Sequence, residues 1–476
     1  MNIRDEIVKK REQQAEKVGF TMGETIPESR EVPLIPFGRS PFLVCEIKRS
    51  SPSKGDIDKS IDAVELAGTY KKAGIKSVSV LTESQYFSGS ITDIMKVKKA
   101  YPKLSVLRKD FLFDEQDIDI SWRAGADAIL LIAGILEKDR FWHLYNKAES
   151  YGLDVLVEVH SEEDIEKIKN REPYFVGINS RDLSSFSIDK AIPLRLKSKI
   201  TWDANLVYES GINHPEDISI AAANGFIGYL VGEAVVRNPE LIGELLHATQ
   251  HYIAGKFWQR LYSSKQKNRP LVKICGFTRE EDIRLAEELG ADVLGFVLAE
   301  SKRKVSTDFI KSITARTRSC PAVGVVVKSD KEPLEEDIKE LIEAGMLDAL
   351  QYHGTESSEY CWQQGVPYYK ALRAKDEQVV DKMREYRSPR VLLDGYSPNA
   401  AGGTGVQVDE KVVEIASKVQ KLWIAGGITP ENVGEYIRRY NPELIDISSG
   451  IEDEPGVKSE EKMRKLFKEI ANASGE

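Results

Sequence analysis

The chain has 476 residues, of which 41% are hydrophobic and 30% charged, and its formal net charge is −9. This length fits two or three domains, and the composition is that of an ordinary globular protein. The acidic balance excludes a nucleic-acid backbone as the expected partner, and no apolar run is long enough to span a membrane. Small anionic substrates are compatible with this balance, because backbone N–H groups at helix N-termini can bind a phosphate.

The N-terminal residues 1–17 are charged and have a helical pattern, without the apolar core of a signal peptide. The four cysteines lie far apart, and no CxxC pair or Cys/His cluster indicates a zinc site or a disulfide framework. We therefore expect a cytoplasmic protein that uses no metal and no cofactor.

Short apolar runs alternate with helix-like segments along the first half of the chain. The first 40 residues precede the first strand and are predicted to be a helical extension that can cover one mouth of a barrel. The eight strands are expected at residues 42–47, 76–81, 104–108, 128–132, 153–159, 174–178, 204–209 and 226–232.

The second half repeats this pattern with eight further strands. They are expected at residues 270–275, 292–297, 322–327, 348–352, 367–372, 390–394, 422–425 and 444–448. Strands that alternate with helices predict a parallel sheet, and eight repeats in each half predict a closed barrel. An open doubly wound sheet is the alternative, but it usually has a Gly-rich loop after its first strand, which neither half has. The predicted fold is therefore α/β, with two tandem (β/α)8 TIM barrels.

A polar and basic stretch separates the two halves, and we place a linker at about 256–270. The predicted domains are residues 1–258 and 259–476. We expect the two barrels to contact each other within one chain.

Charged and polar side chains follow the predicted strands of the first half. Strand side chains alternate with period two, and the C-terminal ends of barrel strands converge at one mouth. Lysines and glutamates that share such a mouth shift each other's pKa values and can act as acids and bases, although a rim ion pair is the alternative for any one of them. These residues are Glu46, Lys48, Lys109, Glu158, Asn179 and Ser210. His160 ends the same strand as Glu158; orienting a neighbour is a sufficient role for it, and we leave it out of the predicted site.

Glycine turns follow the seventh and eighth predicted strands of both halves, at Gly211 and Gly232 and again at Gly427 and Gly450. Loops at these two places commonly form the phosphate site of such barrels. Glycine lets the backbone approach the phosphate, and the start of a helix supplies N–H donors. Tight turns without a ligand are the alternative interpretation.

In the second half, Cys275 ends the first strand and Asp394 ends the sixth, before a glycine-rich loop. A thiolate can take a proton from carbon, and a protonated carboxyl can give one to oxygen. Alone, Cys275 would more often be a small buried hydrophobe and Asp394 a helix cap.

The motifs EIKRSSPSKG, LRKDF, LVEVH, GINSRDL, ESGI and LVGEA resemble indole-3-glycerol phosphate synthase over most of residues 1–255. The resemblance implies that 1-(2-carboxyphenylamino)-1-deoxyribulose 5-phosphate closes a ring and loses carbon dioxide and water. It implies Lys109 or Lys48 as the general acid, with the roles of the two lysines left open. Glu46 and Glu158 are the implied bases. The implied positioning and binding residues are Asn179, Ser210, Ser51, Arg181, Gly211, Gly232 and Glu233.

Glu233 departs from the pattern, since some relatives have a serine there. Phosphate binding is unaffected if only the backbone N–H of Glu233 binds the phosphate. It is weakened if the Glu233 side chain faces the site.

The motifs VKICGFT, SKRKVS, VGVVV, QYHG, LLDG, GGTG, IAGGI and DISSGIE resemble phosphoribosylanthranilate isomerase over roughly 268–472. The implied reaction is an Amadori rearrangement of N-(5′-phosphoribosyl)anthranilate. Asp394 would open the ribose ring as general acid, Cys275 would remove the C2 proton, and Arg303 would bind the anthranilate carboxylate. The implied phosphate ligands are Gly426, Gly427, Ser449 and Gly450. Lys302 stands where proline is usual, and Tyr352 where leucine is common.

The isomerase product is the synthase substrate, so the chain resembles a fused lyase and isomerase of tryptophan biosynthesis with the synthase half first. We expect phosphorylated small-molecule substrates and no nucleic-acid or membrane partner. A histidine-pathway barrel pair would show aspartates at its first and fifth strand ends. A non-catalytic protein that binds phosphorylated ligands is the remaining alternative, and it would lack some of the charged rim residues.

Overall fold

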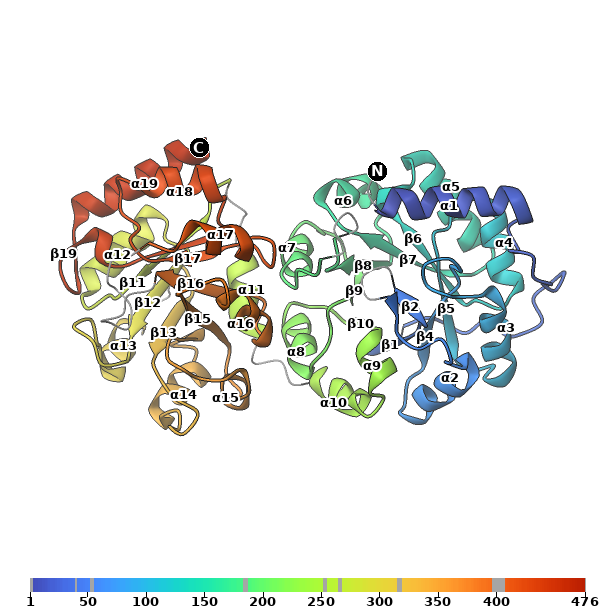
Figure 1. The fold of residues 1–476 in the computed structure, drawn as a ribbon, viewed down its shortest axis with the longest axis horizontal. Helices are drawn as coiled ribbons and strands as arrows, with labels where there is room; N and C mark the ends of the chain where they lie inside the picture. The colour runs from blue at the N-terminus through green and yellow to red at the C-terminus, as the bar shows by residue number, and fades with distance from the viewer. Residues whose placement is uncertain are drawn as a thin grey trace. The chain divides into compact units, whose positions relative to one another are not determined.

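The chain forms two compact units, Met1–Tyr252 and Ile253–Glu476, each of which contains a closed eight-stranded barrel in a ring of helices (Figure 1). The predicted pair of (β/α)8 barrels is confirmed, and every predicted barrel strand is present. The computed structural model describes residues 3–38, 41–51, 55–182, 187–250, 255–263, 268–314, 319–395 and 407–475. Within these residues, no helix is both long and apolar enough to cross a membrane.

The first barrel joins its strands in parallel in the order β1-β10-β9-β8-β7-β6-β5-β4. Its strands are β1 (Phe42–Ile47), β4 (Ser77–Leu81), β5 (Ser105–Lys109), β6 (Ala128–Ile132), β7 (Asp154–Val159), β8 (Phe175–Asn179), β9 (Asn205–Glu209) and β10 (Gly228–Val231). Its helices are α2 (Ala63–Lys72), α3 (Ile91–Ala100), α4 (Glu115–Arg123), α5 (Lys138–Ser150), α6 (Glu162–Ile168), α7 (Ile192–Lys197), α8 (Pro215–Ala223), α9 (Glu233–Arg237) and α10 (Leu241–Ala248). Several of these helices begin at a side-chain cap, such as Asp62, Ser90 and Ser161, which accepts an N–H of the first turn.

The N-terminal extension is less helical than predicted. Among the residues that the structure describes before β1, only α1 (Ile3–Val18) is helical. Gly19 adopts a φ of 80°, the left-handed conformation that ends many helices. Three prolines, at positions 27, 33 and 36, then keep the backbone from resuming a helix.

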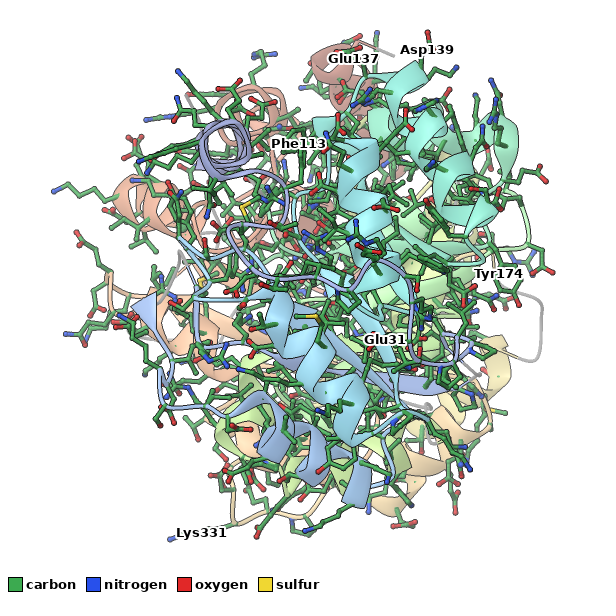
Figure 2. All side chains as sticks on the ribbon, turned by 90° about the vertical axis from the view of Figure 1, so that its right-hand side faces the viewer. Glu31, Phe113, Glu137, Asp139, Tyr174 and Lys331 are labelled. Carbon is green, nitrogen blue, oxygen red and sulfur yellow. The ribbon has the colours of Figure 1, made fainter. Side chains whose placement is uncertain are left out.

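Helix α1 lies over the C-terminal end of the first barrel. Arg11 Nη2 donates to Asp117 Oδ1 at 2.8 Å, and Arg11 Nε donates to Asp110 Oδ1 at 3.4 Å, just beyond the end of β5. The guanidinium also lies 5.8 Å from the ring centre of Phe113, which Figure 2 labels. The extension therefore covers part of the mouth that the sequence predicts to hold the site.

The rest of the extension contacts the opposite end of the same barrel. Arg30 Nη2 donates to Asp127 Oδ1 at 2.6 Å, and the Phe37 N–H donates to Asp154 Oδ2 at 2.8 Å, where β6 and β7 begin. The Phe37 ring packs edge-on against Phe42 at 5.7 Å between centroids. These contacts close the floor of the barrel with apolar side chains.

The second barrel runs in chain order from β11 to β18. Its strands are β11 (Leu271–Cys275), β12 (Val293–Val297), β13 (Ala322–Val326), β14 (Ala349–Tyr352), β15 (Tyr368–Ala374), β16 (Val391–Gly395), β17 (Trp423–Ala425) and β18 (Leu444–Ile447). Its helices are α11 (Lys256–Ser263), α12 (Glu280–Leu289), α13 (Thr307–Thr314), α14 (Glu336–Glu343), α15 (Ser358–Gln363), α16 (Val379–Glu385), α17 (Glu410–Ala416), α18 (Val433–Tyr440) and α19 (Glu460–Ser474). Two short hairpins, which sequence patterns do not reveal, lie in strand-to-helix connections. They are β2 (Ser50–Ser51) with β3 (Gly55–Asp56), and β19 (Glu452–Glu454) with β20 (Val457–Lys458).

The predicted linker at about 256–270 includes a helix, α11, that packs on the second barrel. The Phe257 ring stacks on Tyr369 at 5.9 Å, and the Trp258 ring lies 5.6 Å from Trp423. Because these aromatic side chains are buried against the second barrel, α11 belongs to that unit. The predicted boundary at 258/259 would cut this helix, whereas the two units divide between residues 252 and 253.

Candidate active sites

The polar side chains of the first mouth follow the period-two rule of its strands. Glu158 stands two residues after the interior side chain Leu156, and Glu209 two residues after Val207. Lys109 follows the interior Leu107 in the same way. The apolar layer of the barrel interior therefore continues upward into a charged layer at the C-terminal mouth.

Lys109 links two carboxyl groups in this layer. Its Nζ donates to Glu158 Oε2 at 2.9 Å and to Glu209 Oε2 at 2.8 Å. Burial would lower the pKa of Lys109, but the charges of the surrounding glutamates outweigh burial and raise that pKa above its ordinary value. Burial likewise would raise the pKa of Glu158, but Lys109 and His160 hold it well below its usual range. The pair therefore exists as an ammonium and a carboxylate at neutral pH.

Glu209 is the site residue that our sequence analysis missed, because only its neighbour Ser210 was selected from the end of this strand. Ser210 has a φ of 66° and its carbonyl accepts from Ser180 Oγ at 3.0 Å, so it begins the turn after β9. Burial raises the pKa of Glu209 to about 8, with Glu158 adding to the rise and Lys109 opposing it. The alternation with the interior Val207 was the signal that identifies Glu209.

Glycine at position 177 makes room for this carboxylate. A Cβ placed on Gly177 would lie 1.9 Å from Glu209 Oε1. Gly232 does the same for the pair at the end of β1, since a Cβ there would lie 2.7 Å from Glu46 Oε1. That pair is formed by Lys48 Nζ and Glu46 Oε1, 2.6 Å apart. The structure thus brings Glu46, Lys48 and the Lys109 cluster to one mouth, as predicted.

His160 also belongs to this mouth. Its Nε2 lies 2.8 Å from Glu158 Oε1, and its Nδ1 lies 3.0 Å from the Arg181 carbonyl oxygen. The Arg181 N–H donates to Asn179 Oδ1 at 3.0 Å, so the side chain of Asn179 is held at the end of β8. Burial lowers the pKa of the Arg181 guanidinium, while Glu46 and Glu233 raise it.

The glycine turns predicted after the seventh and eighth strands of the first barrel are present. Gly211 has a φ of 74°, and Gly232 directly precedes α9, where Glu233 is the first residue. Glu233 Oε1 accepts from Arg237 Nε at 2.8 Å, one turn further along α9. Ser51 is buried at the end of β2, and the loop after it, residues 52–54, lies outside the described residues.

In the second mouth, Cys275 lies at the end of β11. A Cβ on Gly295 would lie 2.7 Å from its Sγ, so the thiol fills the space that this glycine leaves on β12. Burial raises the pKa of the Cys275 thiol, with Lys273 opposing the rise and Asp446 adding to it. The thiol is therefore the resting form at neutral pH.

Asp394 ends β16 on the same mouth. His353 Nε2 lies 3.1 Å from Asp394 Oδ2, an ion-pair distance at which the two atoms are not aligned for a hydrogen bond. His353 Nδ1 lies 3.0 Å from Gln351 Nε2. His353 stands within the motif QYHG. The sequence alone does not distinguish such a histidine from a buried structural one. The glycine-rich loop at 396–406 lies outside the described residues.

A buried polar layer lies beneath these groups. Lys273 Nζ donates to Asp446 Oδ2 at 2.5 Å and to Gln351 Oε1 at 2.8 Å. Tyr369 donates to the same Gln351 oxygen at 2.8 Å. Since Lys273 stands two residues before Cys275, both point into the barrel and the ammonium lies below the thiol.

Arg303 lies beside the catalytic candidate Cys275, since a Cβ on Gly276 would lie 2.6 Å from Arg303 Cδ. Its guanidinium is held by Glu452, with Nε to Oε1 at 2.9 Å and Nη2 to Oε2 at 2.7 Å. Lys458 Nζ donates to Glu452 Oε1 at 2.8 Å and to the Cys275 carbonyl at 2.6 Å. The β19–β20 hairpin therefore ties Arg303 to the end of β11.

The two glycine turns of the second mouth touch each other. Gly426 and Gly427 have φ angles of 97° and 64°. A Cβ on Gly450 would lie 2.0 Å from the Ile428 carbonyl oxygen, so only glycine fits between the two turns. Ser449 begins the short 3-10 turn that contains Gly450. This packing forms one cradle of backbone atoms at the ends of β17 and β18.

The two departures noted in the sequence have different consequences. Lys302 is exposed in the turn that precedes Arg303, and the guanidinium still reaches the mouth. Tyr352 is buried on the outer side of β14 and packs against Tyr360 and Tyr368. Tyr352 therefore packs between the sheet and the helices.

The fold and the two mouths define a tandem-barrel protein with acid and base groups at the C-terminal end of each barrel. Residues 6–245 match the family "Indole-3-glycerol phosphate synthase", and residues 272–469 match the family "N-(5'phosphoribosyl)anthranilate (PRA) isomerase". The chain belongs to these two families in one polypeptide, the first barrel to the synthase family and the second to the isomerase family.

Three relatives illustrate this membership. The chain is 31% identical over 448 residues to "Multifunctional tryptophan biosynthesis protein" of Schizosaccharomyces pombe, a match that covers 87% of the chain and 57% of the relative. It is 30% identical to "Tryptophan biosynthesis protein TrpCF" of Haemophilus influenzae, which covers 91% of the chain and 87% of the relative. The first half is 39% identical to "Indole-3-glycerol phosphate synthase" of Oceanobacillus iheyensis, covering 48% of the chain and 86% of the relative. The matches with three multifunctional fungal relatives span 57%, 62% and 63% of those proteins.

Proposed function

We propose that the chain catalyses two consecutive steps of tryptophan biosynthesis on phosphorylated small-molecule substrates. The second barrel would isomerise N-(5′-phosphoribosyl)anthranilate, and the first would convert the product to indole-3-glycerol phosphate. Family membership supports both activities. The observation that carries the synthase assignment is the Lys109 ammonium, which donates to two carboxyl groups. The pKa of Glu158 is lowered and that of Glu209 is raised, so one can accept a proton and the other can give one.

In the isomerase step, Asp394 gives a proton to the ribose ring oxygen. The C1–O bond breaks and a Schiff base forms between C1 and the anthranilate nitrogen. The Cys275 thiolate then removes the C2 proton, and the resulting enolamine becomes the ketone as the C2 hydroxyl releases a proton and C1 takes one up. Because burial raises the pKa of Cys275, the thiolate is the minor form at neutral pH and the rate should rise with pH.

In the synthase step, the Lys109 ammonium gives a proton to the ketone oxygen while the anthranilate ring carbon attacks C2, so the ketone becomes a hydroxyl. Carbon dioxide leaves that ring carbon. The new hydroxyl then leaves as water after it takes a proton, a role that suits Glu209 because its pKa is about 8. The Glu158 carboxylate removes the proton from C1 as the indole double bond forms, since its low pKa keeps it ionised.

The phosphates would bind to backbone N–H groups at Gly211, Gly232 and Glu233 in the first mouth. In the second mouth they would bind at the cradle formed by the turns at 426–427 and 449–450. Pairing of Glu233 with Arg237 supports this assignment, because the carboxylate is compensated by a cation outside the phosphate turn. Arg303 would hold the anthranilate carboxylate. The assigned roles of Lys48, Asn179, Ser210, Ser51 and Arg181, the contact between the barrels and the cytoplasmic location stay predictions.

The test is an assay of the purified chain with N-(5′-phosphoribosyl)anthranilate as the only substrate. We expect carbon dioxide and indole-3-glycerol phosphate to form without an added enzyme. A protein that binds the substrate and returns it unchanged would contradict the proposal and support the non-catalytic alternative.

A further inference from the structure

His160 occupies a fixed place next to the proposed base of the first barrel. It stands two residues after Glu158, so both side chains point into the mouth. Its side chain is 12% exposed. Its N–H of the main chain donates to Asp164 Oδ2 at 2.9 Å, which anchors the residue to the first turn of α6.

The two partners of its ring determine how many protons the ring region holds. Nδ1 faces the Arg181 carbonyl oxygen at 3.0 Å, and a carbonyl oxygen can only accept, so Nδ1 carries a proton. Nε2 faces Glu158 Oε1 at 2.8 Å. This second contact needs one proton, either on Nε2, which makes an imidazolium beside a carboxylate, or on Glu158 beside a neutral ring. Either way the pair holds one proton more than a neutral histidine beside a carboxylate.

The surrounding charges favour the imidazolium. Glu158 Oε2 accepts from the Lys109 ammonium, which favours an ionised carboxylate. Asp164 on α6, which accepts the main-chain N–H of His160, adds a nearby negative charge, while Glu209 on β9 is largely neutral below pH about 8. Burial would lower the pKa of His160, but Glu158, Arg181 through its carbonyl, and Asp164 together raise it.

We propose that His160 is a positioning residue of the synthase site that works as an imidazolium. It clamps Oε1 of Glu158, leaves Oε2 facing Lys109 and the mouth, and keeps the carboxylate ionised and ready to accept a proton. This inference rests on the proposed synthase function. Our sequence analysis placed His160 outside the site and gave it only the role of orienting a neighbour.

The proposal predicts a shift in pH dependence when the ring is replaced by a neutral amide. In His160→Gln, Glu158 loses one of its two cationic partners, so its pKa rises. The acid limb of the synthase rate should then move to higher pH by about one unit, with a rate loss that is largest at low pH and small on the plateau. The isomerase rate in the same sample should not change, which also reports that the chain is folded.

The matched control is His143→Gln. His143 pairs with Glu115 through its Nε2, but its side chain is 53% exposed on α5. We expect its pH profile to superimpose on that of the unchanged chain. His160→Ala also removes the hydrogen bond to Glu158, so its synthase rate should be lower at every pH. The rate of His160→Gln should lie between those of His160→Ala and the unchanged chain.

A spectroscopic readout separates this inference from the proposed function. In 15N-histidine-labelled chain, the resonances that disappear in His160→Gln should show both ring nitrogens protonated at neutral pH. A neutral ring with a bare Nε2, or a rate loss in His160→Gln that is the same at every pH, would overturn the proposal. Absence of synthase activity in the unchanged chain would overturn the proposed function, whereas the resonances would still decide the protonation state of the pair.

Discussion

The two mouths use one scaffold but place their lysines in different layers. In the first barrel, Lys109 is the last residue of β5 and its side chain keeps 15% of its surface exposed, so it can touch a substrate. In the second, Lys273 is fully buried two residues before the strand end, where Cys275 stands instead. The two lysines therefore differ by one period-two repeat in their distance from the strand end. At the strand end the ammonium itself faces the mouth, whereas one repeat earlier it lies beneath a thiol that faces the mouth.

The difference fits the two proposed chemistries. In the proposed synthase step, ring closure onto a ketone builds negative charge on oxygen, which the partly exposed Lys109 ammonium would stabilise directly. The proposed isomerase step needs a base to remove a proton from carbon, and the charge of the buried Lys273 opposes the rise that burial causes in the pKa of Cys275. Each mouth keeps a glycine beside its reactive group, Gly177 under Glu209 and Gly295 under Cys275.

Lys109→Ala should give the largest effect. It removes the cation shared by Glu158 and Glu209, and we expect the synthase rate to fall by about 10²–10⁴-fold. The isomerase rate should stay unchanged, because no group of the second mouth is altered. Rates of the two steps are measured separately on purified substrates, and loss of both in a folded chain would contradict two independent sites.

Arg11→Met should destabilise the first barrel more than the second, because helix α1 is tied to the mouth of the first barrel. The change leaves Asp110 and Asp117 with one buried cationic partner fewer, and breaking such a pair costs about 3–5 kcal/mol. Denaturant unfolding followed by the two activities should show synthase activity lost first. Equal loss of both activities would show that α1 does not stabilise the first barrel selectively.

Gly177→Ala tests the packing of Glu209. The added methyl would overlap the carboxylate, and we expect a cost of about 1–3 kcal/mol and a lower synthase rate. Gly243→Ala is the control, because a Cβ at this position in α10 meets nothing within 4 Å. It should be neutral or slightly stabilising, by about 0.4–1 kcal/mol. Equal effects of the two changes would mean that the carboxylate is placed elsewhere.

Glu209 should also give the first barrel a measurable pH dependence of stability. Its pKa is about 8 in the folded chain and 4.5 ordinarily, so between these values the folded state holds a proton that the unfolded chain has released. The free energy of unfolding therefore falls as pH rises through this window. Glu209→Gln removes this contribution, so its Tm relative to the unchanged chain should increase with pH. A constant difference in Tm would contradict the raised pKa.

The two barrels could be predicted from the sequence because each strand is a short apolar run. The alternation of side chains along the strand also predicts that the polar residue at its end points into the mouth. The same alternation identifies Glu209 as a mouth residue, because it stands two residues after the interior Val207. The sequence therefore contained the information for Glu209, although the motif pointed to its neighbour Ser210. Other features depend on contacts between distant segments. Arg11 meets Asp110 across 99 residues, and Lys273 meets Asp446 across 173, so neither pair is visible in a local pattern.

The helix α11 shows a different limit. Its basic and polar composition is typical of a linker, but Phe257 and Trp258 bury their rings on the second barrel. Local composition could not reveal this, because the rings that receive them, Tyr369 and Trp423, lie far along the chain.

The most direct test of two independent mouths is complementation between two inactive chains. Lys109→Ala should isomerise the substrate and stop, and Cys275→Ala should leave N-(5′-phosphoribosyl)anthranilate unchanged. An equimolar mixture of the two should form indole-3-glycerol phosphate, because the product released by one chain is the substrate of the other. A mixture of folded variants that forms none would contradict the account.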